Sequence, residues 1–66
     1  MTVIVNGQPR QLAAPLTVAA LLEQLATPPR GKAVEVNEQI VPRARHAEHV
    51  LADGDKLEIV SLVGGG

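Results

Sequence analysis

The stretch Val3-Ile4-Val5-Asn6-Gly7 decides how this chain begins to fold. Three β-branched residues in a row predict a strand, and the Asn-Gly pair favours the positive φ angles of a type I′ turn, the strongest short signal for a β-hairpin. The returning strand should cover residues 8–13. Because Pro9 cannot donate a hydrogen bond to a neighbouring strand, this second strand belongs at an edge of the sheet. The uninterrupted apolar run before the turn favours a place in the centre of the sheet for the first strand.

An amphipathic helix follows the hairpin. Thr17 is a natural N-cap, and apolar residues then recur with the spacing of one buried helix face. These residues are Val18, Leu21, Leu22 and Leu25. The segment Thr27-Pro28-Pro29 should end the helix, since proline disfavours helical geometry in the residue before it.

Two short strands follow the helix. Residues 33–36 and 40–41 are expected to be strands on either side of a turn at residues 37–39. Residues 43–51 show no clear period, so they are interpreted as an irregular or briefly helical connection.

The last strand is expected over residues 56–63, after the turn signal Asp53-Gly54-Asp55. Leu57 and Ile59 alternate with charged residues and should face the core. A hairpin, one helix and further strands predict a single two-layer α+β domain over residues 1–63. The expected core consists of Val3, Val5, Leu21, Leu25, Val36, Leu57 and Ile59.

Composition excludes several classes of function. The chain has 66 residues, a net charge of −1, no cysteine and no aromatic residue. Single-stranded nucleic-acid binders stack bases on aromatic rings, and phosphate-binding surfaces need an excess of basic residues, so no nucleic-acid partner is expected. The apolar start is too short for a signal peptide or a membrane span. We therefore expect a cytoplasmic protein without membrane contact, whose core relies on aliphatic packing.

No side chain offers a convincing reactive centre. Ser61 is the only serine, and it lies in a predicted strand without an adjacent base. His46 and His49 lie three residues apart, but no further histidine or cysteine completes a metal site, so we expect surface or packing roles and no metal. Asp53 and Asp55 are interpreted as turn residues.

Gly64-Gly65-Gly66 is the unusual feature of the sequence. Such a stretch can be a frayed end or a cloning remnant. It can also be a flexible tail that passes through a narrow channel, because glycine has no side chain, and three extended residues reach about 10 Å. We expect this tail to bring the carboxylate of Gly66 to the α-phosphate of a nucleotide bound by an enzyme. The apolar residues before it, Val60, Leu62 and Val63, are the expected partner surface.

These pieces together resemble the ThiS family of sulfur carriers and, less closely, the small subunit of molybdopterin synthase and ubiquitin. The resemblance covers essentially the whole chain and rests on the order and spacing of the pieces. They are residues 3–7, 17–22, 34–37 with 40–43, 51–59, and 63–66. The resemblance implies a ubiquitin-like β-grasp fold, with a mixed sheet of four to five strands packed on one helix.

The resemblance also implies that the chain is a protein co-substrate and not an enzyme. A ThiF-type adenylating enzyme would use ATP and magnesium to adenylate Gly66. A sulfur-donor protein would convert the adenylate to a thiocarboxylate, and a ThiG-type thiazole synthase would take the sulfur for thiamine biosynthesis. The carrier itself would bind no cofactor.

Alternatives to this role stay open. The sulfur could go to molybdopterin or to a tRNA base, Gly66 could be joined to a lysine as in ubiquitin-like modifiers, or the domain could bind partners without covalent chemistry. A terminal glycine favours a sulfur-carrier or modifier role over non-covalent binding alone. Residues 60–63 stand where the molybdopterin-type carrier commonly has prolines, which favours the thiamine role.

Two positions depart from the family pattern. Glu38 follows Asn37 where many relatives have glycine, so that turn could differ. His46 stands where many relatives have an aromatic residue, which favours a packing role for it.

Overall fold

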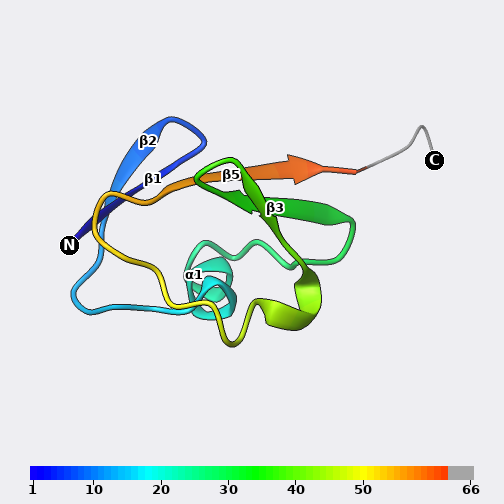
Figure 1. Ribbon diagram of the computed structural model, residues 1–66, viewed down its shortest axis with the longest axis horizontal. Coiled ribbons are helices and arrows are strands. Elements are labelled where there is room, and N and C mark those ends of the chain that lie inside the picture. The colour runs from blue at the N-terminus through cyan, green and yellow to red at the C-terminus, as the bar shows by residue number, and fades with distance from the viewer. Residues whose placement is uncertain (63–66) are drawn as a thin grey trace.

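A computed structural model describes residues 1–62 of the chain. Their elements are β1 (Thr2–Val5), β2 (Gln8–Gln11), α1 (Val18–Gln24), β3 (Lys32–Val36), β4 (Gln39–Val41), the 3-10 helix η1 (Arg43–Arg45) and β5 (Lys56–Ser61). The strands form one sheet in the order β2-β1-β5-β3-β4, and α1 covers one of its faces (Figure 1). This is the predicted ubiquitin-like β-grasp, with η1 inside the segment that was expected to be briefly helical.

Strand β5 occupies the centre of the sheet, and β1, which was predicted to be central, lies beside it and not at an edge. It runs parallel to β1, with Ile4 opposite Lys56 and Val5 opposite Leu57. It runs antiparallel to β3 from the Lys32–Ser61 pair to the Val36–Leu57 pair. The edge position predicted for the strand with Pro9 is confirmed, because β2 pairs only with β1.

Both hairpins turn through residues with positive φ. Asn6 and Gly7 have φ angles of 49° and 82°, and Asn37 and Glu38 have 53° and 69°. Positive φ at both central residues is the type I′ pattern, as predicted for Asn6-Gly7. The second turn has the same pattern although Glu38 occupies a position that favours glycine, and the left-handed conformation costs a non-glycine residue roughly 1–2 kcal/mol.

The helix begins at the predicted N-cap. The Thr17 hydroxyl accepts a hydrogen bond from the Ala20 amide at 3.1 Å. The first-turn amides of Val18 and Ala19, which have no partner inside the helix, donate to the carbonyls of His49 and His46 at 2.9 Å each. The segment after β4 therefore holds the start of α1 against the sheet.

The helix ends before the prolines, which corrects the prediction. Ala26 adopts a φ of 53°, and its amide donates to the Glu23 carbonyl at 3.0 Å, while the Thr27 amide donates to the Leu22 carbonyl at 2.9 Å. These two bonds form the Schellman motif, which satisfies the last helical carbonyls. Pro28 comes two residues after Ala26 and does not itself end the helix.

One apolar core fills the space between α1 and the sheet. The buried residues are Val3, Val5, Leu12, Val18, Leu21, Leu22, Val34, Val36, Val41, Leu51 and Leu57. This confirms the prediction for Val3, Val5, Leu21, Val36 and Leu57. Leu25 and Ile59 are only partly buried at the margin of the core. Leu12 was missed because it follows four exposed strand residues with no apolar alternation, and Leu51 because it ends a segment without a hydrophobic period.

Candidate functional site

The described part of the chain ends one residue after β5. The strand runs away from the N-terminus (Figure 1), and its last ladder pair joins Ser61 to Lys32. The Leu62 amide then donates to the Gly31 carbonyl at 2.7 Å, so the chain stays attached to the sheet up to this residue. Val63, Gly64, Gly65 and Gly66 lie outside the described residues, and their roles stay predictions.

Asn6 holds β5 near the end that leads to the tail. Its Oδ1 accepts a hydrogen bond from the Ile59 amide at 2.8 Å, and its Nδ2 donates to the Ile59 carbonyl at 3.4 Å. Strand β1 ends at Val5, so beyond this residue the side chain of Asn6 replaces the backbone pairing between β1 and β5. The sequence identified Asn6 only as a turn residue.

Asn37 holds the other end of β5. Its backbone amide donates to the Lys56 carbonyl at 2.7 Å, and its side-chain Oδ1 accepts from the Lys56 backbone amide at 3.0 Å. Its Nδ2 also donates to Asp55 Oδ1 at 3.0 Å. Both ends of the strand are therefore fixed by asparagine side chains from hairpin turns.

Asp53 and Asp55 have the structural roles that were predicted. Asp53 Oδ1 accepts from the Thr2 amide at 2.7 Å, and Asp55 Oδ2 accepts from the Ala52 amide at 2.8 Å. These bonds order the turn before β5 and connect it to β1. The two carboxylates act as turn residues and not as a catalytic pair.

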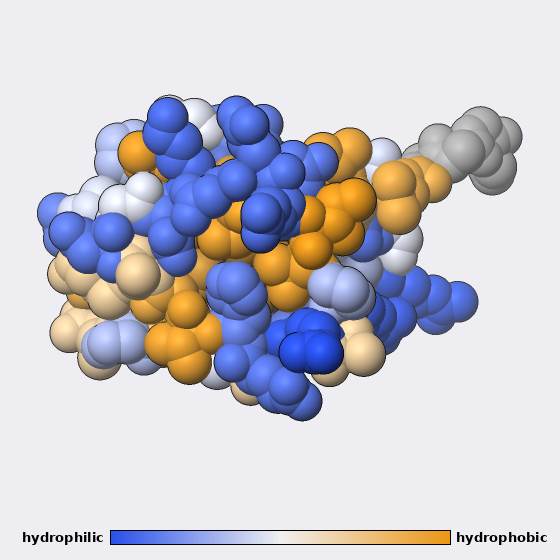
Figure 2. All heavy atoms as spheres, viewed as in Figure 1, coloured by the Kyte–Doolittle hydropathy of each residue, from blue (hydrophilic) through white to orange (hydrophobic). Residues whose placement is uncertain are grey.

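The face of the sheet that points away from α1 carries an apolar surface. Val60 is 47% exposed and Leu62 is 61% exposed, as expected for the predicted partner surface. We define the outer surface as Ile4, Ala33, Ile40, Val60 and Leu62. Ala33 pairs with Val60, and Ile40 is 69% exposed on β4. Figure 2 shows hydrophobic residues at the end of β5 beside strongly hydrophilic ones, the arrangement typical of a contact surface.

Two carboxylates lie on the same face as the outer surface. Glu35 on β3 lies directly opposite Glu58 on β5. Like charges in this relationship are unfavourable. A partner that brings a basic side chain to this position would relieve the repulsion and would add orientation to the apolar contact.

The remaining candidate residues form no reactive site. Ser61 is exposed in the β3–β5 ladder. His46 is 5% exposed, and its Nε2 lies 3.0 Å from the Val41 carbonyl, which confirms a packing role. Within residues 1–62, no three histidine, aspartate or glutamate side chains come together in a way that could hold a metal ion. No helix in this part of the chain is long and apolar enough to cross a membrane.

The match to known proteins covers the fold, the outer surface and the glycine tail together. A model of the ThiS family matches residues 3–66. The chain belongs to the ThiS family. It is 42% identical to the sulfur carrier protein ThiS of Escherichia coli K12, over the whole of both chains. A crystal structure of the thiamine biosynthesis protein ThiS from Geobacter metallireducens superposes with a TM-score of 0.87 at 30% identity, again over the whole of both chains.

Other relatives in the family comparison are much longer. The chain is 47% identical over 66 residues to a thiazole synthase of Paramagnetospirillum magneticum, and it spans 20% of that protein. It spans the same share of a thiazole synthase of Magnetococcus marinus, at 36% identity. A domain of the ThiS type is thus part of the same polypeptide in these two proteins.

Proposed function

We propose that the chain is a sulfur carrier in thiamine biosynthesis, acting as a protein co-substrate and not as an enzyme. The observation that carries the proposal is the full-length match to the Escherichia coli carrier, within a family model that extends through the glycines to residue 66. The chain has no cysteine, so a sulfur atom cannot be carried on a side-chain thiol. The proposed carrier group is the carboxylate of Gly66.

The proposed chemistry begins on a ThiF-type adenylating enzyme that holds ATP and magnesium. The Gly66 carboxylate attacks the α-phosphate, pyrophosphate leaves, and an acyl-adenylate forms. Sulfide-level sulfur from a sulfur-donor protein then attacks the acyl carbon and AMP leaves, which produces a thiocarboxylate without any change in the oxidation state of the sulfur. The carrier binds no cofactor in this scheme, and we propose that the reaction takes place in the cytoplasm.

The structure supports the proposal that the outer surface binds the partner enzyme while the tail carries the reacting group. The outer surface offers exposed Val60 and Leu62 for docking, while Asn6 keeps the last part of β5 fixed beside β1. A docked domain would therefore present its tail from a defined position. Accurate positioning of reacting groups is a large part of rate acceleration in such reactions.

A thiazole synthase is the proposed acceptor of the sulfur. The support is that a ThiS-type domain forms part of proteins named thiazole synthase in two organisms. Fusion places the two functions at a high effective concentration, which benefits partners that act in succession.

The test is reconstitution with intact-mass analysis. The chain is incubated with a ThiF-type enzyme, ATP, magnesium and a sulfur donor, with the Escherichia coli carrier as a positive control. We expect a product heavier by the difference between sulfur and oxygen, and we expect thiazole synthase to return it to the original mass. If the control gains sulfur and this chain does not, the proposal is wrong.

The same samples separate the alternative roles. Consumption of the thiocarboxylate by molybdopterin synthase and not by thiazole synthase would move the chain to molybdopterin synthesis. Conjugates of the chain with other proteins on denaturing gels of cell extracts would identify a protein modifier.

A further inference from the structure

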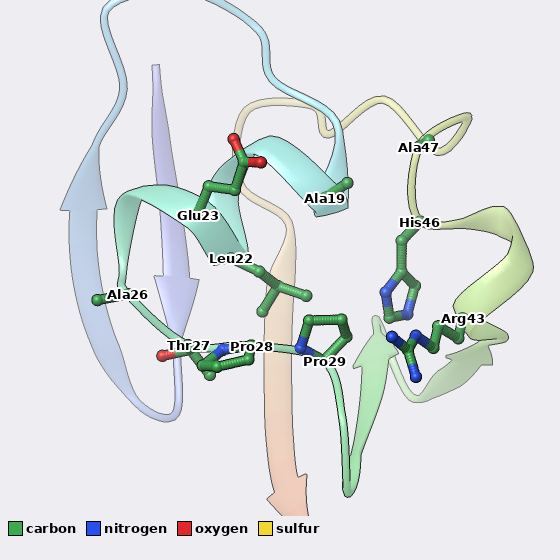
Figure 3. Close-up of a pocket in the computed structure, with 10 residues that line it drawn as sticks. All are labelled: Ala19, Leu22, Glu23, Ala26, Thr27, Pro28, Pro29, Arg43, His46 and Ala47. Carbon is green, nitrogen blue, oxygen red and sulfur yellow. The ribbon is translucent and has the colours of Figure 1, made fainter.

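A pocket lies on the helix side of the molecule, away from the outer surface. It lies between α1, the proline segment after it, and the residues that follow β4 (Figure 3). Its cavity volume is about 550 Å³, within the range of small-ligand sites. The residues that matter to the argument are Ala19, Leu22, Pro29, Arg43, His46 and Ala47.

The pocket is apolar because of the residues that surround it. Leu22 and Pro29 supply its walls, while the short side chains of Ala19 and Ala47 leave the space between them unfilled. The chain contains no Phe, Tyr or Trp, so none of its own rings can occupy this space. A flat apolar group from another molecule fits the pocket in size and in polarity.

His46 adds one polar feature to this apolar pocket. Its Nε2 lies 3.0 Å from the Val41 carbonyl, and because a carbonyl only accepts, Nε2 carries the proton. In the neutral imidazole, Nδ1 is then an acceptor. It is buried and has no hydrogen-bond partner among residues 1–62, which is rare in folded proteins. Figure 3 shows the imidazole ring reaching from the segment after β4 toward Leu22 and Pro29.

We infer that this pocket binds a planar apolar ring that carries a single N–H or O–H donor, of the indole or phenol type, with the donor bonded to His46 Nδ1. Nδ1 is covered in the free chain, so a ligand reaches it when a lining side chain turns aside. Arg43 is exposed and points toward the imidazole in Figure 3. The inference is independent of the sulfur-carrier proposal, since neither Gly66 nor the outer surface takes part.

The test compares two rings of nearly equal shape on the full chain. Indole has the N–H donor, and benzofuran has an oxygen in its place. Amide NMR spectra are recorded during titration with each ring. We expect saturable shifts at Ala19, Leu22 and Ala47, and a dissociation constant about fivefold lower for indole, the typical effect of one hydrogen bond. Equal affinities, or no saturable shifts at these residues, would overturn the inference.

Two variants assign the effect to the pocket. His46→Phe keeps a ring but removes the acceptor, so it should bind both compounds equally. Ala47→Leu fills the pocket from an exposed position and should abolish binding of both. A preference for indole that persists in His46→Phe, or binding that persists in Ala47→Leu, would contradict the inference.

A third compound identifies the natural source of the ring. N-acetyltryptophanamide presents the indole as it occurs in a protein. If it binds as indole does, a tryptophan of a docked partner can supply the ring. If only indole binds, the pocket encloses the whole ligand, and the source is a free aromatic molecule.

Discussion

Asn6 and Asn37 hold opposite ends of the same strand. Each is the first of the two central residues of a type I′ turn, with φ angles of 49° and 53°, and each bonds β5 through its side chain. Asparagine tolerates the left-handed region better than most residues. The two positions therefore combine a backbone requirement with a side-chain function, and glycine satisfies only the backbone requirement.

Replacement of Asn6 by glycine should destabilise the domain. Glycine keeps the positive φ but removes both bonds to Ile59, so we expect a loss of about 1 kcal/mol in the free energy of unfolding. Urea denaturation measures this. Asn6→Asp is the matched control, because it keeps the oxygen that accepts from the Ile59 amide, and its effect should be smaller. Equal stability of Asn6→Gly and the unaltered chain would show that the side chain contributes nothing.

Replacement of Glu38 by glycine should have the opposite effect. Glu38 has a φ of 69°, and its side chain is exposed, so glycine relieves strain without loss of packing. We expect an increase of about 0.5–1 kcal/mol in the free energy of unfolding, after allowing for the greater freedom of glycine in the unfolded chain. Glu38→Ala removes the charge but keeps the strain, and it should leave stability nearly unchanged. A gain in Glu38→Ala as large as in Glu38→Gly would contradict the strain argument.

Truncation of the helix face should show where the core ends. Leu21 is 1% exposed, whereas Leu25 is only partly buried. Leu21→Ala should cost roughly 2–5 kcal/mol, which approaches the total of about 3–5 kcal/mol expected for a domain of this size. Leu25→Ala should cost markedly less. Urea melts of both variants provide the comparison, and equal losses would show that the burial difference has no energetic meaning.

A charge on the outer surface should disrupt docking and leave the fold intact. Leu62 is 61% exposed, so Leu62→Asp has little effect on packing. We expect at least about tenfold weaker binding to the ThiF-type enzyme in calorimetric titration, since a buried unpaired charge costs more than 1.4 kcal/mol. Val50→Asp is the control, because Val50 is 60% exposed and lies outside the outer surface. Undiminished binding by Leu62→Asp would remove Leu62 from the interface.

Adenylation should depend on the length of the glycine tail. Deletion of Gly66 moves the carboxylate by one residue, about 3.5 Å, which is large compared with the tolerance of positioned reactions. One extra residue after Gly66 moves it in the other direction. Both variants should lose ATP–pyrophosphate exchange with the activating enzyme.

The melting behaviour of these tail variants is the control. Both should unfold as the unaltered chain does, because residues 64–66 follow the last strand of the domain. Exchange at the original rate in both variants would exclude the terminal-carboxylate mechanism.

Much of the fold could be predicted because its determinants are local. Asn6-Gly7 specifies the first turn, and Thr17 caps the helix through its own hydroxyl. Pro9 places its strand at an edge. Each of these features depends on a few neighbouring residues, so the sequence alone is enough to predict it.

The contacts that join distant segments could not be predicted in the same way. The parallel register of Ile4 with Lys56 and the bonds from Asn6 to Ile59 link residues more than fifty positions apart. The stop that the left-handed Ala26 imposes just after α1 was also missed, since a left-handed alanine has no distinctive sequence signal. The unpaired Nδ1 of His46 and the pocket beside it become visible only when α1 and the segment after β4 are packed together.

The central strand of the sheet is also the last one along the described chain. While a ribosome is still translating the message, the β1–β2 and β3–β4 hairpins can each form, but no strand pairs with both of them until residues 56–61 emerge. Until then each hairpin has an unpaired edge, the kind of edge that chaperones and proteases encounter in nascent chains. An activating enzyme that recognises the completed sheet would therefore select fully translated carriers over unfinished ones.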